Sequence, residues 1–136
     1  MNAKEYLSQM RCIKAIVAIK QEQIEELRVL AEKASAAISN TPPGGTRNVN
    51  RMEDIIVKMV DLQNEMQTDY DNLITLKKDI SAAIRAVSCF EHRALLEMRY
   101  LHFSPWSVIA DTLHYSKPHV MKLHKTALSA VKVPSN

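Results

Sequence analysis

The residues with the most suggestive chemistry in this chain are basic and lie toward its C-terminal end. No acidic side chain follows Asp111, whereas four lysines do: Lys117, Lys122, Lys125 and Lys132. Residues 88–136 hold six Lys and Arg against three Asp and Glu, so the net charge of +3 arises there. A surface with this bias suits phosphate groups, and an ordinary solvated helix face is the alternative.

Other side chains that could do chemistry do not form a catalytic pattern. His114, His119 and His124 are five residues apart, which scatters them around a helix instead of placing them on one face as metal ligands. The sequence has no H-E-x-x-H motif, no phosphate-binding glycine loop and no nucleophile elbow. We therefore predict a protein that is not an enzyme and that uses no metal and no cofactor.

The lysines must be positioned by short helices. Ser104 and Pro105 predict a helix start, with the serine as N-cap and the proline at the first helical position. After a turn at 114–116, Ser116 is expected to cap a last helix. The apolar residues of that helix recur at i, i+3, i+7 and i+11: Val120, Leu123, Ala127 and Val131. Two helices joined by a three-residue turn predict a helix-turn-helix, with Trp106 in its core.

The second helix of this pair is where DNA contacts are expected. In a helix-turn-helix, the N-terminal residues of the second helix meet base edges in the major groove. With the apolar positions facing inward, the predicted DNA-binding residues are Ser116, Lys117, Pro118, His119, Met121, Lys122 and Lys125. Lysine lacks the bidentate fork of arginine, so sequence-specific readout is expected to be weak. His114 stands in the turn where glycine is more usual, and histidine tolerates a left-handed backbone better than most residues.

The rest of the sequence predicts an antiparallel helical hairpin over residues 1–87, followed by a helix-turn-helix domain over 88–136. Glycine and proline are absent from 3–38 and 51–87, and the Pro42-Pro43-Gly44-Gly45 run breaks the helical pattern between them, giving an expected loop at 39–50. Two glycines in all and 5% aromatic residues agree with an all-α protein. The thin core of such a hairpin leaves room for a homodimer through further apolar residues.

Two apolar stripes fix the register of this hairpin. From Tyr6 to Ile38 and from Met52 to Val87, apolar residues follow alternating steps of three and four. Folding the stripes antiparallel pairs residues whose numbers sum to 89 or 90, such as Leu27 with Leu62 and Ile38 with Met52. The one polar residue of the first stripe, Lys20, then meets the one charged residue of the second, Asp69. We predict an ion pair that specifies the register.

The C-terminal motifs resemble region 4 of sigma-70-type transcription factors. The resemblance lies in Met98-Arg99-Tyr100, in Trp106, Ile109-Ala110, Leu113 and Tyr115-Ser116, and in Val120, Leu123-His124 and Ala127-Leu128. Together with the Pro-Pro-Gly-Gly break and the segment 57–66, the chain is similar to small proteins of Gram-positive phages and prophages. The resemblance implies a DNA-binding transcription regulator that acts on double-stranded DNA.

A second hypothesis, a role in protein interaction, remains open beside DNA binding. Region 4 contacts RNA polymerase as well as promoters, so the chain could be a protein-interaction module that docks on polymerase or another partner, with the hairpin as a dimerisation or spacer arm. The isolated Cys12 and Cys89 and the lack of any long apolar run predict a cytoplasmic protein with reduced thiols and no membrane contact.

Overall fold

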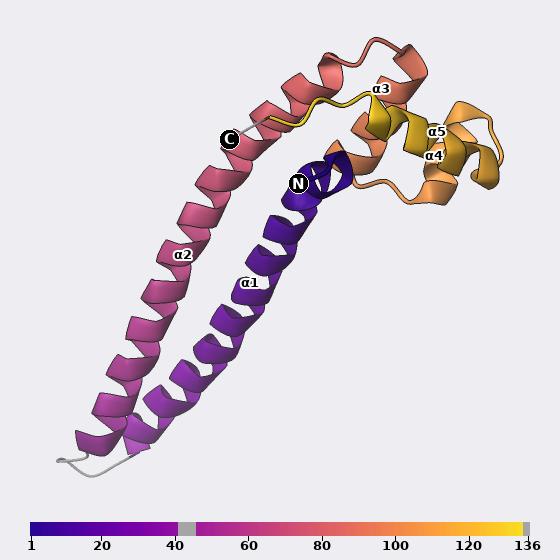
Figure 1. The fold of residues 1–136 in the computed structure, drawn as a ribbon. Coiled ribbons are helices and arrows are strands. Elements are labelled where there is room, and N and C mark those ends of the chain that lie inside the picture. The colour runs from indigo at the N-terminus through magenta and orange to yellow at the C-terminus, as the bar shows by residue number, and fades with distance from the viewer. Residues whose placement is uncertain (41–45, 135–136) are drawn as a thin grey trace. The chain divides into compact units, whose positions relative to one another are not determined.

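The computed structural model describes the backbone of residues 1–40 and 46–134, and the side chains of residues 1–37 and 49–134. The elements are, in chain order (Figure 1), α1 (Ala3–Asn40), α2 (Thr46–Arg85), α3 (Phe90–Leu96), the π-helical turn η1 (Glu97–Leu101), α4 (Trp106–Leu113) and α5 (Lys117–Ser129). The predicted fold class is confirmed: a long antiparallel hairpin of α1 and α2 precedes short packed helices, and the described residues form no strand.

The expected loop between the two long helices was too long. α1 continues to Asn40 and α2 begins at Thr46, so residues 39–40 and 46–50, which were assigned to the loop, are helical. Residues 46–50 include no glycine or proline, and nothing in their backbone prevents the helix from extending back toward the Pro-Pro-Gly-Gly run. The expected loop residues at 41–45 lie outside the described part of the chain.

The two apolar stripes do form the contact between α1 and α2. Every stripe residue with a described side chain is buried or half-buried. Between residues 15 and 37 and between 49 and 71, all residues outside the stripes are exposed. A heptad pattern places one narrow face of each helix against its partner, and the burial follows that face. We call this contact the seam.

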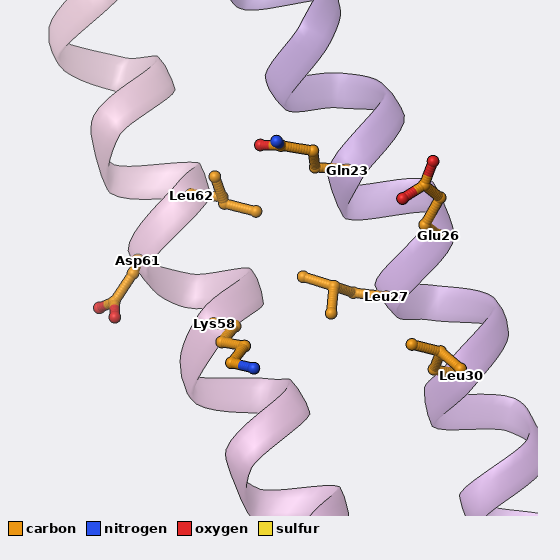
Figure 2. A pocket seen from close by; sticks show the side chains of 7 residues that line it. All are labelled: Gln23, Glu26, Leu27, Leu30, Lys58, Asp61 and Leu62. Carbon is orange, nitrogen blue, oxygen red and sulfur yellow. The ribbon is translucent and has the colours of Figure 1, made fainter.

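The register of the seam is confirmed by side chains that meet across it. Lys20 Nζ donates to Asp69 Oδ2 at 2.7 Å, as the matching breaks in the two stripes predicted. Figure 2 shows Leu27 and Leu62 pointing toward one another from the two helices, beside a surface groove of about 410 Å³. Ile24 and Met66 line another groove together. The predicted pairing of Ile38 with Met52 lies outside the described side chains.

The ion pair of the seam has a further member that the sequence did not reveal. Glu65 Oε2 lies 3.5 Å from Lys20 Nζ, on the turn of α2 that precedes Asp69. The hydrogen bond to Asp69 is the main cause that raises the pKa of Lys20, while desolvation acts against it. The ammonium group is thus held by one close carboxylate and one more distant one.

Apolar side chains also remain on the outer surface of the two long helices. Ile16 and Leu30 of α1 are exposed, as are Ile56 and Ile74 of α2. They are the residues through which the sequence suggested self-association. A homodimer stays a prediction.

Contacts group the chain into two compact units. One comprises residues 1–14 and 72–136, and the other residues 15–71. This grouping differs from the predicted division between residues 87 and 88. Contact units are not the same as domains, so the predicted domain boundary stays a prediction. No helix in the described part of the chain is long and apolar enough to cross a membrane.

Candidate nucleic-acid interface

The helices after residue 89 are held by one apolar core. Leu95 and Leu96 of α3, Ile109 of α4 and Val120 of α5 are fully buried in it, and Ala127 lies beside them. α5 packs on both α3 and α4. The core therefore fixes which face of α5 points inward and which face stays in solvent.

The start of α4 differs from the prediction. Pro105, not Ser104, is the N-cap: its backbone is extended, and its carbonyl accepts from the N–H groups of Val108 and Ile109 at 3.1 Å. Ser104 instead belongs to the end of the preceding turn, because its N–H donates to the Met98 carbonyl at 2.9 Å. Its own carbonyl accepts from Arg99 Nη1 at 3.2 Å. These two bonds hold Ser104 away from the capping position.

The turn between α4 and α5 is built as the sequence predicted. His114 adopts a left-handed conformation, with φ 61° and ψ 38°, and ends α4. Ser116 is the N-cap of α5, and its Oγ accepts from the His119 N–H at 3.3 Å. The left-handed residue reverses the chain and the cap restarts the helix, so the start of α5 is placed by local geometry.

A side-chain contact fastens this turn to α3. The Tyr115 hydroxyl donates to Glu91 Oε1 at 2.8 Å, and this bond is the main cause that raises the pKa of Tyr115. The Tyr115 ring also lies against the His119 ring, with centroids 4.4 Å apart. The first turn of α5 thus packs through His119 against Tyr115 of the preceding turn, which α3 holds in place through Glu91.

The predicted DNA-binding residues are all solvent-exposed. These are Ser116, Lys117, Pro118, His119, Met121, Lys122 and Lys125. Val120 and Ala127 are buried and Leu123 is half-buried, in agreement with the predicted inward face. Three lysines, Lys117, Lys122 and Lys125, thus lie on the solvent-exposed face of α5. Their contact with DNA stays a prediction.

The buried face of α5 also carries a polar residue that sequence reasoning missed. His124 is buried, and a 2.6 Å hydrogen bond joins its Nε2 to the Tyr100 hydroxyl. Burial, with smaller contributions from Lys4 and Arg99, lowers the pKa of His124 to about 4. The imidazole is therefore neutral at pH 7 and shares this hydrogen bond with the Tyr100 hydroxyl, whose pKa is raised by burial.

Trp106 was expected in the core and is only half-buried. Its ring meets the His124 ring edge-on, with centroids 4.7 Å apart, and the Arg99 guanidinium lies 4.4 Å from its centroid. Arg99 contacts both this ring and the Ser104 carbonyl. The indole therefore forms part of the surface of the unit.

Basic residues from the other end of the sequence join this surface. Lys4 and Arg11 of α1 line one pocket together with Arg99, Trp106 and Lys125. The helical pattern of α1 gave no reason to place these residues beside α5. The signal that could have suggested it is Leu7, an apolar residue outside the stripe that is fully buried in the core shared with the C-terminal helices.

Comparison with known proteins gives a family. The family described as "Protein of unknown function (DUF1492)" matches residues 33–132. This chain belongs to the DUF1492 family. None of the curated proteins and none of the solved structures matches it. The matched residues include α2 and all of the short helices, and the description of the family names no activity.

Proposed function

We propose that this DUF1492 protein binds double-stranded DNA through the exposed face of α5. The observation that carries the proposal is the placement of Lys117, Lys122 and Lys125 on the open side of a helix that begins at a left-handed turn and a serine cap. Such a helix presents basic side chains in the way that helix-turn-helix proteins present them to the major groove.

The chemistry of this face favours phosphate contacts over base readout. Lysine is a compact charge without a bidentate fork, and Pro118 and Met121 offer only apolar contact. We therefore propose general affinity for duplex DNA with modest sequence preference. The resemblance to sigma-70 region 4 extends the proposal to a transcription regulator of phage or prophage type.

The test is a matched pair of double variants measured by fluorescence anisotropy on duplex DNA at several salt concentrations. Lys117→Ala with Lys122→Ala is expected to weaken binding at least tenfold and to reduce the log–log salt slope by about 2, at roughly 0.9 per lost phosphate contact. Lys77→Ala with Lys78→Ala removes the same charge from exposed positions of α2 and is expected to bind like the parent protein. Equal affinities of the two folded double variants would refute the assignment to α5.

A second candidate function is docking on RNA polymerase or another protein. It is favoured by three large apolar side chains that remain exposed near the same helices: Phe90, Val108 and Met121. Exposed apolar residues of this kind are common at protein interfaces. A partner held through them would show a shallow salt dependence, whereas DNA bound through several phosphates loses affinity steeply with salt.

A further inference from the structure

A basic pocket lies in the unit formed by residues 1–14 and 72–136. It has a volume of about 400 Å³ and is lined by residues from α1, η1, α4 and α5. Its polar lining includes Lys4, Ser8 and Arg11 from the start of α1, with Arg99 and Lys125 from the C-terminal helices. Four cationic side chains therefore converge on one space from three separate elements.

No carboxylate in the part of the chain that the structure describes is paired with these charges. No acidic residue lines the pocket. Among the described residues, none of the four cations has a carboxylate oxygen within 4 Å, since the ion pairs found there involve only Lys20 and Arg28. Desolvation and the nearby charge of Arg11 lower the pKa of Arg99. Like charges held together in this way repel one another, and a bound anion would remove that repulsion.

The number and type of the cations indicate which anion fits. Four positive groups around one small space exceed what a single carboxylate neutralises, and they match the two or more charges of a phosphate group. Arginine offers a fork of N–H donors and lysine a mobile point charge, a combination suited to phosphate oxygens. The Ser8 side chain adds a neutral hydroxyl to the lining.

The remaining wall of the pocket combines the rings of Tyr100, Trp106 and His124 with the aliphatic side chains of Met121 and Leu128. Trp106 lines it, and the ring is braced by Arg99 at 4.4 Å and by His124 at 4.7 Å. A volume of about 400 Å³ falls in the range of small-ligand pockets. There is space for a phosphate together with a flat organic group of modest size.

We infer that this pocket binds a phosphate ester, with the phosphate held by Lys4, Arg11, Arg99 and Lys125 and the organic group against Trp106. The ester can come from two sources, a free nucleotide or the backbone of DNA, because Met121 and Lys125 also lie on the exposed face of α5. This inference does not rest on the proposed DNA binding, because the cations and the volume of the pocket are the same whether or not α5 binds DNA.

Trp106 provides a direct readout, because it is the single tryptophan of the chain. Titration of the full-length protein with inorganic pyrophosphate at constant ionic strength is expected to change its fluorescence saturably. Lys4→Gln with Arg11→Gln should weaken that binding at least tenfold. Lys33→Gln with Lys78→Gln, which removes two charges from exposed positions outside the pocket, should leave it unchanged. Calorimetry of the same titrations measures binding independently of the fluorophore.

Two further titrations separate the sources. If a free nucleotide is the ligand, ADP binds more tightly than pyrophosphate, and the Lys4→Gln/Arg11→Gln variant keeps the salt slope of the parent on duplex DNA. If the DNA backbone is the ligand, the slope of log affinity against log salt concentration on duplex DNA is smaller by about 2 for that variant than for the parent, at roughly 0.9 per lost phosphate contact. Either result supports phosphate binding in the pocket.

The inference is overturned if pyrophosphate gives no saturable fluorescence change and no binding heat, or if both double variants bind it as the parent does. A protein that binds pyrophosphate in the pocket but binds no duplex DNA would refute the proposed function and leave this inference standing. The two hypotheses therefore fail separately.

Discussion

The two compact units bury their side chains to different depths. In residues 15–71 the described structure consists of one segment of α1 and one of α2, and its most buried residues keep a few per cent of their surface in contact with solvent. In the other unit, the ends of the same helices meet the short C-terminal helices. All large described side chains that are fully buried lie there: Leu7, Met10, Ile80, Ile84, Leu95, Leu96, Ile109 and Val120.

The comparison shows what a third element adds to a pair of helices. Two helices can cover only a narrow stripe on each other, so residues beside the stripe stay exposed. Where further helices pack, residues outside the stripes are covered as well, as at Leu7 and Ile84. The seam can therefore accept the pair of Lys20 and Asp69 at its partly exposed edge, whereas the deeper core holds the buried His124 neutral and hydrogen-bonded.

The largest effect is expected from two leucines of α1 that lie outside the stripe, one in each unit. Leu7 is 0% exposed and Leu30 is 40% exposed. Leu7→Ala should lower the free energy of unfolding by about 3–5 kcal/mol, because it leaves a cavity in a closed core. Leu30→Ala should cost about 1 kcal/mol or less. Urea denaturation of both variants measures the difference, and similar losses would mean that the two units are packed alike.

A smaller effect is expected from pH. His124 has a pKa of about 4 in the folded protein, lowered chiefly by burial, and about 6.5 when unfolded. Between these values the unfolded chain binds the extra proton, so stability is full above pH 6.5 and falls as the pH drops toward 4. By pH 4.5 the loss should reach about 2 kcal/mol.

The control for this pH dependence is His124→Gln, which removes the titrating group. Each protein is compared with its own stability at pH 7, so that the lost contact with Tyr100 does not enter the comparison. The variant should lose less stability than the parent between pH 7 and 4.5. Equal losses would show that His124 is not the group responsible.

The smallest effect is expected at the seam. Lys20→Met should destabilise the hairpin less than Leu7→Ala does, because it leaves Asp69 without its close partner at a site that water still reaches. Changing both residues, Lys20→Met with Asp69→Leu, should restore most of the loss. A double-mutant cycle measures the coupling, and an uncoupled pair would contradict a role in setting the register. Glu65→Gln tests the contribution of the more distant carboxylate.

The sequence by itself determined the features that depend on local pattern. A repeat of alternating threes and fours, with Pro-Pro-Gly-Gly between its two halves, specifies a helical hairpin, and the matching breaks at Lys20 and Asp69 specify its register. The Ser116 cap, the left-handed His114 and the period of α5 likewise placed the lysines on an open face. These features follow from the chemistry of neighbouring residues.

Only the tertiary structure decided which distant surfaces meet. The start of α1 shares a core with α5, which buries Leu7 and brings Lys4 and Arg11 to Arg99 and Lys125. The tertiary structure also brings the Tyr100 hydroxyl within hydrogen-bonding distance of His124 and leaves Trp106 partly exposed to solvent. A helical period states which face of a helix is apolar, but not which other helix covers it. Many apolar surfaces are equally able to bury a leucine, since burial has no direction, so the partner is chosen by the packing of the whole unit.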